Sequence, residues 1–326
     1  MQVTRTKPVL GMMAVLISAA LVTGCASWWS QDKDSIARNE HMRMLEMQKS
    51  AEAARASMNT PKELPEPDAR GLEQLGDNYV RQGNVAMAFV QYEKALDKDP
   101  KLESAKVKKG YLFLSRGMDD DALKVFEDVL SRDPQNALAL EGRGRVRMSK
   151  NNPDAAIADF DKALAVDPQL WQVYALRGLI FDRRKEYDRA IGDYEKAIAI
   201  KSDSSLLYNN LGMAYFLKGD NKKAADAYAQ AIKLDFNNRR AYNNLGLVLF
   251  KMGFYNEALL SFKQGGDAAA AYNNMGCLYL AEKKYDKAIE AFEQAITLKP
   301  QYYAKAQENM VKARAGLASL QAAPTQ

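Results

Sequence analysis

The residues whose type and spacing could do chemistry are asparagines in a pentapeptide that the chain spells three times. YNNLG begins at Tyr208 and at Tyr242, and YNNMG begins at Tyr272. A primary amide offers two N–H donors and an acceptor oxygen, so a ladder of asparagines can hydrogen-bond a peptide backbone without demanding a charge. The spacing therefore predicts peptide binding by these amides, which regular elements must hold in place.

Catalytic and metal chemistry have little support in the sequence. His41 is the only histidine, which excludes a histidine-based triad or a multi-histidine metal site within one chain. No phosphate-binding loop and no nucleophile paired with a base is recognisable. We therefore expect no enzyme, no catalytic or metal-binding residue and no small-molecule substrate. The 46 Lys and Arg are interspersed with 41 Asp and Glu, which argues against nucleic acid as the main partner.

The first 25 residues have the order of a secretory signal. Arg5 and Lys7 precede an apolar run, Val9 to Val22, that is too short to span a bilayer comfortably, and LVTGC closes it. This stretch resembles a bacterial lipoprotein signal, which implies removal of residues 1–24 and a covalent lipid, rather than any cofactor, on Cys25. Ala26 in place of aspartate resembles cargo of the outer membrane. An uncleaved inner-membrane anchor is the alternative.

Residues 25–68 are expected to form a lipidated tether. Trp28 and Trp29 suit the headgroup region of a membrane, or else they pack on the protein. Residues 34–58 are rich in helix formers and could form one amphipathic helix. The prolines of TPKELPEP, which starts at Thr60, predict a stiff spacer.

From Ala69 a 34-residue period takes over. When each repeat is numbered so that its glycine is slot 8, slot 20 is always alanine and slot 24 is always aromatic. Such a period is typical of stacked helix-turn-helix units, in which the small residues let the two helices approach and the aromatic fills the space beside them. The slot-8 glycines are Gly76, Gly110, Gly144, Gly178, Gly212, Gly246 and, after only 30 residues, Gly276.

This is the tetratricopeptide pattern, and residues 69–302 resemble that family. The resemblance implies an all-α superhelical solenoid of seven helix-turn-helix repeats. Residues 303–320 are expected to form a helix that caps the open end of the core, and residues 321–326 a disordered tail. KQGGDAAAA, which starts at Lys263, shortens the sixth repeat by four residues and should change the rotation between repeats six and seven.

In stacked units of this kind the first helix, helix A, forms the inner, concave wall. We expect slots 4, 8 and 11 to pack, and slots 2, 5, 9, 12 and 13 to open to a groove. The slot-5 asparagines are the hypothesis for peptide contact, with a solvated face as the alternative, whereas those in slot 6 are expected mainly to bond neighbouring backbone. The candidate groove residues are Asn209, Asn243 and Asn273 in slot 5, Asn210, Asn244 and Asn274 in slot 6, and Phe216 and Phe250 in slot 12.

A second candidate site is basic. Slot 7, usually leucine, is basic in repeats two to four, and EGRGRVR adds two further arginines. We interpret these residues as a basic ridge for an acidic segment or a C-terminal carboxylate, with a solvated ridge as the alternative. The ridge comprises Lys109, Arg143, Arg145, Arg147 and Arg177.

The lipoprotein signal followed by tetratricopeptide units resembles the TadD-like lipoproteins of the tight-adherence (Flp) pilus system. It is similar, more loosely, to the pilotin-type tetratricopeptide lipoproteins of type IV pili. The stretch from Ala241 to Ile296, with its shortened unit GGDAAAAYNNMG, carries the closer resemblance.

The resemblance implies a protein-binding scaffold, lipid-anchored at the periplasmic face of the outer membrane, whose groove holds a segment of a secretin or pilus subassembly. Two other functions are open from the sequence. One is an adaptor for peptidoglycan hydrolases or synthases, and the other is a component of an exopolysaccharide export system.

Overall fold

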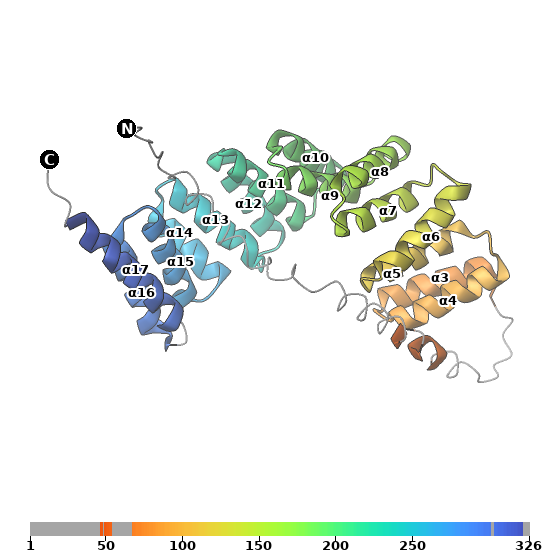
Figure 1. Cartoon of the computed structure of the whole chain (residues 1–326), viewed down its shortest axis with the longest axis horizontal. Helices are drawn as coiled ribbons and strands as arrows, with labels where there is room; N and C mark the ends of the chain where they lie inside the picture. The colour runs from red at the N-terminus through yellow and green to blue at the C-terminus, as the bar shows by residue number, and fades with distance from the viewer. Residues whose placement is uncertain (1–45, 48, 54–66, 301–302, 322–326) are drawn as a thin grey trace, which may run out of the picture. The chain divides into compact units, whose positions relative to one another are not determined.

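The computed structural model describes residues 46–47, 49–53, 67–300 and 303–321, and every regular element in these ranges is a helix (Figure 1). The signal peptide, Cys25 and most of the tether therefore lie outside the described residues, as does nearly all of the predicted tail. The described part of residues 46–53 is helical, as expected.

Between Ala69 and Leu298 the described helices form seven consecutive helix-turn-helix pairs, which confirms the predicted architecture. In each pair the first helix is helix A and the second is helix B, and α17 (Tyr303–Gln321) follows as the predicted final helix. The pairs are α3 (Ala69–Arg81) with α4 (Val85–Lys98), α5 (Glu103–Ser115) with α6 (Asp119–Arg132), α7 (Ala137–Ser149) with α8 (Pro153–Val166), α9 (Trp171–Arg183) with α10 (Tyr187–Ile200), α11 (Ser205–Lys218) with α12 (Asn221–Leu234), α13 (Arg239–Lys251) with α14 (Tyr255–Gly265), and α15 (Ala268–Ala281) with α16 (Tyr285–Leu298).

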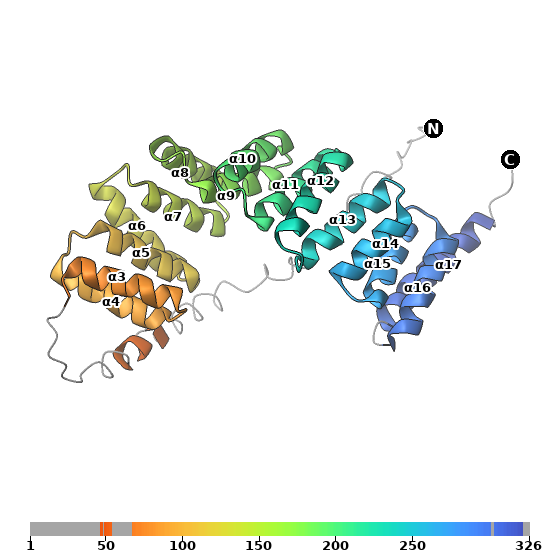
Figure 2. The ribbon, with the colours of Figure 1, turned by 180° about the vertical axis from the view of Figure 1, so that it is seen from behind.

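The chain divides into two compact units. One spans residues 40–271, and the described part of the other runs from Tyr272 to Gln321. In the first unit each helix pair packs together, and each helix A also packs on helix B of the preceding repeat, as both ribbon views show for α3 to α14 (Figure 2). In the second unit α16 packs against α17. Six repeats thus form one continuous stack.

The slot-8 glycines position the helices as predicted. A Cβ added at Gly144 would lie 2.5 Å from the ring of Phe160, and one at Gly76 would lie 2.4 Å from the ring of Tyr92. All seven slot-8 glycines meet the slot-24 aromatic of their own repeat in this way, and all seven slot-20 alanines are fully buried. Glycine is therefore required for close approach of helices A and B.

Helix α14 is the shortened helix that the sequence predicts. It has 11 residues, whereas α12 and α16, the corresponding helices of the flanking repeats, have 14. It ends at Gly265, and Gly266 continues in an extended conformation. The division between the two units follows a few residues later, so the predicted change of rotation stays a prediction.

Candidate functional site

The paired asparagines link consecutive repeats. The Asn244 amide Nδ2, in slot 6 of repeat six, donates a hydrogen bond of 3.1 Å to Oδ1 of Asn209, in slot 5 of repeat five. The same two slots are joined between repeats one and two, where Nζ of Lys108 lies 2.8 Å from Oε1 of Glu73. Slot 5 of one repeat and slot 6 of the next therefore form a polar contact at these two junctions between repeats.

This contact overturns the expected placement of the slot-5 asparagines. Asn209 is 4% exposed and Asn273 is 7% exposed, so neither side chain opens to a groove. Asn243 is half-buried, and its Nδ2 donates to the carbonyl oxygen of Gly265 at the end of α14, at 3.3 Å. The burial and hydrogen bonds of these three asparagines fit a structural role. The prediction of a slot-5 ladder that faces a ligand is wrong in placement, because the flank that carries slot 5 is covered by neighbouring helices.

The slot-6 asparagines lie at a more open position. Asn210, Asn244 and Asn274 are all half-buried. In the first unit, slots 2, 6, 9 and 13 of helix A share one helical face, since they are spaced by four, three and four residues. We call this surface the A-helix face.

The two phenylalanines of the predicted groove differ in burial. Phe216 is half-buried, as a residue at the edge of the A-helix face would be. Phe250 is only 1% exposed, and its ring packs edge-on against Tyr255 with centroids 5.0 Å apart. Phe250 is therefore a core residue, and its predicted groove contact is wrong.

The basic ridge is neutralised within the fold. Arg143 donates to buried Asp159 from Nε at 2.9 Å and from Nη2 at 2.7 Å, and Arg147 adds a contact of 2.8 Å to the same carboxylate. Arg177 makes the same bidentate pair with Asp193, at 2.7 Å from both nitrogens. These hydrogen bonds raise the pKa of both bidentate arginines above the ordinary value.

The remaining ridge residues are also paired. Nζ of Lys109 lies 2.5 Å from Oε1 of Glu93 and close to the rings of Phe89 and Phe113. Arg145 is the most open, with 44% of its side chain exposed and a contact of 3.5 Å to Glu141. The expectation of a ridge of available cations is therefore wrong, because its residues satisfy acids of helix B or of a neighbouring turn.

The A-helix face changes character along the first unit. In repeats one to three, slot 9 holds Asp77, Tyr111 and Arg145. In repeats four to six the same slot holds half-buried apolar residues: Leu179 on α9, Met213 on α11 and Leu247 on α13. The central helix of this apolar part also presents Leu206, 55% exposed, and Leu217, 41% exposed.

One acidic residue that the sequence pattern did not single out adjoins the apolar part of the A-helix face. Asp182 occupies slot 12 of α9, where the other repeats hold Val, Leu, Met or Phe. Its Oδ2 accepts a hydrogen bond of 2.8 Å from the Tyr194 hydroxyl, while its buried Oδ1 has no hydrogen-bond partner among the described residues. Burial raises the pKa of the Asp182 carboxyl to about 6. Asp182 could have been recognised from the sequence, because slot 12 is apolar in every other repeat.

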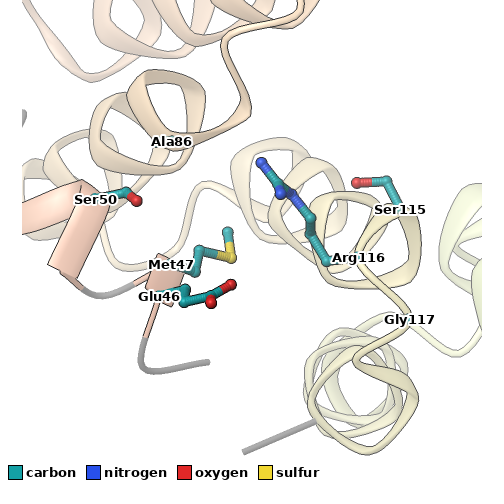
Figure 3. A pocket seen from close by; sticks show the side chains of 7 residues that line it. All are labelled: Glu46, Met47, Ser50, Ala86, Ser115, Arg116 and Gly117. Carbon is teal, nitrogen blue, oxygen red and sulfur yellow. The ribbon is translucent and has the colours of Figure 1, made fainter. Parts of the chain in front are cut away.

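A pocket of about 470 Å³ lies near the start of the first unit (Figure 3). Met47 and Arg116 lie on opposite sides of it, and the side chain of Glu46 borders it from below Met47. Met47 itself is buried in the hydrophobic cluster that contains Tyr92. The lining residues are Glu46, Met47, Ser50, Ala86, Ser115, Arg116 and Gly117, a set without a nucleophile–base pair.

The described part of the chain contains neither a metal-binding cluster nor a membrane-spanning helix. No group of three or more histidine, cysteine or acidic residues there could hold a metal ion. Nor does any helix within these ranges have the length and apolar character needed to cross a membrane.

Comparisons of the sequence with family models decide the family. Models of the tetratricopeptide repeat match residues 73–137, 107–170, 141–205, 212–253 and 269–302. The chain belongs to the tetratricopeptide-repeat family. Proteins built from tetratricopeptide repeats bind other proteins and are generally not enzymes, so this chain is a protein-interaction scaffold.

Several solved structures are similar to this chain, and two of them match with a TM-score of 0.50 or more. The Cut9–Hcn1 hetero-tetramer of APC/C matches with a TM-score of 0.55 and 19% identity, over 73% of this chain and 48% of the other. PilF of Pseudomonas aeruginosa matches with a TM-score of 0.50 and 23% identity, over 63% of this chain and 96% of the other. MamA matches with a TM-score of 0.45 and 29% identity, over 48% of this chain and 91% of the other. No curated protein matches the chain in sequence.

Proposed function

We propose that this tetratricopeptide scaffold is anchored by a lipid on Cys25 at the periplasmic face of the outer membrane. There it holds a segment of a secretin or of another pilus component on the A-helix face of repeats four to six. Holding the client at the membrane would assist assembly of the pilus or secretion machine. The signal sequence that ends at Cys25 supports the anchor, and the resemblance to TadD-like lipoproteins supports the client.

The observation that carries the binding site is the apolar part of the A-helix face. Leu206 and Leu217 are exposed on α11, and half-buried Met213 lies between them in sequence on the same face. Only about half of each leucine is exposed, so covering one is worth about 1 kcal/mol, and a partner that covers both gains part of its binding energy there. An exposed apolar strip of this kind marks an interaction surface and suits a partner helix that carries apolar residues on one side.

The proposal is tested by affinity purification of the lipidated protein from gently solubilised outer membrane after crosslinking in the cell. A secretin or pilus component should dominate the captured proteins, and deletion of the gene should deplete the assembled secretin multimer. Capture of murein hydrolases or synthases without any secretin, with the multimer intact, would favour the peptidoglycan adaptor instead.

The anchor has its own test. Replacement of Cys25 by serine removes the thiol that would carry the lipid, so the protein should lose fatty-acid labelling and leave the outer-membrane fraction. Cys277, which lies half-buried in α15, is the matched control, and its serine variant should keep both the label and the location. Unchanged labelling of the Cys25→Ser variant would contradict lipidation at this residue.

A further inference from the structure

Asp182 differs from the other covered carboxylates of the first unit in having no cation. Buried Glu73 pairs with Lys108 at 2.8 Å, Asp159 with Arg143 at 2.7 Å, and Asp193 with Arg177 at 2.7 Å. Asp182 receives only the hydroxyl of Tyr194, and Oδ1 receives no donor in the described part of the chain. The fold therefore leaves one acceptor oxygen unused.

The groups around Asp182 explain why no internal cation reaches it. Tyr194 comes from α10, and the pKa of the Tyr228 phenol on α12 is raised by burial and, to a lesser extent, by the charge of Asp182. Asp193 adds negative charge near Tyr194. Arg183, next in the chain, lies in slot 13, is exposed and forms no ion pair with Asp182 within the described ranges.

This arrangement is costly for a residue that only supports the fold. A buried acceptor without a donor is unfavourable, and a carboxylate in apolar surroundings is more so unless a cation compensates it. Leu179, one helical turn before Asp182 on the same helix, and Met213 and Phe216 in the matching slots of α11 make the neighbouring surface apolar. Ionisable groups kept in such surroundings are found preferentially at functional sites.

We propose that Asp182 selects the partner by receiving the lysine or arginine side chain of an otherwise apolar segment bound on the A-helix face. This inference rests on the proposed function, because it places the cation on the segment that the scaffold binds. Since Oδ1 is covered in the structure, binding requires a change of the Asp182 rotamer that brings the carboxylate to the surface. The charge pair satisfies the unused oxygen, and the apolar slots around it take the rest of the segment.

The test uses immobilised helical 14-residue peptides with leucines at three- and four-residue spacing and one central position that is lysine, norleucine or glutamate. Binding of the full chain, purified in detergent, is measured at pH 7.5 and at pH 5. Lysine peptides should bind about tenfold more tightly than norleucine peptides at pH 7.5, as a charge-assisted hydrogen bond permits. The preference should fall to about twofold or less at pH 5, where the Asp182 carboxyl is largely protonated.

Two variants decide the role of the carboxyl. Asp182→Asn should abolish the lysine preference while norleucine peptides bind as before, and Asp226→Asn, a change at an exposed position of α12, should leave the preference intact. Equal binding of lysine and norleucine peptides, or a preference that survives Asp182→Asn, would overturn the proposal while leaving peptide binding standing. If peptides of none of the three sets bind, both this proposal and the proposed binding face fail.

Discussion

Replacing Asp182 by asparagine should change how the stability of repeat four depends on pH. The pKa of the carboxyl is raised from 3.8 to about 6 in the folded protein, so the folded state binds the proton more tightly than the unfolded state. The wild-type protein therefore gains stability as pH falls from 7.5 through about 6 towards 4. Asparagine cannot titrate, so the variant lacks this gain.

The magnitude follows from the pKa. At about 1.4 kcal/mol per pKa unit, the difference gives an upper bound of about 3 kcal/mol. Solvent screening at a half-buried side chain reduces this to roughly 1.5 kcal/mol. About two thirds of this gain falls between pH 7.5 and pH 4.5, so the stability of Asp182→Asn relative to wild type should decrease by about 1 kcal/mol over this range. The cost of burying the new amide does not depend on pH and cancels in this comparison.

A local probe is available for the measurement. Trp171 is the first residue of α9, the helix that carries Asp182, and the other two tryptophans are Trp28 and Trp29. Urea titrations followed by Trp171 fluorescence, with Trp28 and Trp29 replaced by phenylalanine, report on repeat four across this pH range. A stability difference that stays constant with pH would refute the reasoning, and Asp226→Asn supplies the flat control.

Three further changes test the packing, each followed by urea denaturation. Asp159→Ala should cost about 2–3 kcal/mol because it leaves two partly buried arginines without their carboxylate. Asp188→Ala, in an exposed pair with Lys218, should cost clearly less, and equal costs would contradict this. Gly144→Ala should lower stability because its Cβ would lie 2.5 Å from an aromatic ring. Gly192→Ala, where the added Cβ meets open space, should raise stability by up to about 1 kcal/mol. A gain in stability at both sites would contradict the packing described for Gly144. Asn209→Ala should cost about 1–2 kcal/mol because it removes the buried acceptor between repeats five and six. An unchanged urea midpoint would show that this hydrogen bond does not stabilise the fold.

The helical framework could be predicted because it depends on contacts within one repeat. Slot 8 and slot 24 lie sixteen residues apart, so a contacting pair such as Gly110 and Phe126 can be recognised from its spacing alone. The four-residue shortening near Gly265 was visible for the same reason. Tertiary packing then follows the local pattern.

The orientation of slot 5 could not be predicted from helical periodicity alone. At about 100° per residue, slot 5 lies only about 70° to one side of the centre of the face formed by slots 2, 6, 9 and 13, and both sets fit one broad stripe. Which flank is covered depends on how the next repeat docks. Asn244, 35 residues after Asn209, reveals that contact only in three dimensions.

The pairing of the basic residues had a signal that the sequence analysis did not use. Arg143 with Asp159 and Arg177 with Asp193 share a separation of sixteen residues. A basic residue in slot 7 followed by aspartate in slot 23 would have predicted an ion pair between helices A and B.

The central claim, that the A-helix face of repeats four to six binds a partner, is tested most directly by a photoreactive amino acid at single positions of repeat five in the cell. Leu217, 41% exposed on α11, lies on this face, and Ala229, exposed on α12, is the control on helix B of the same repeat. The account predicts that position 217 crosslinks to a secretin or pilus component and that position 229 does not. Crosslinks from position 229 alone, or equal crosslinking from both positions, would contradict it.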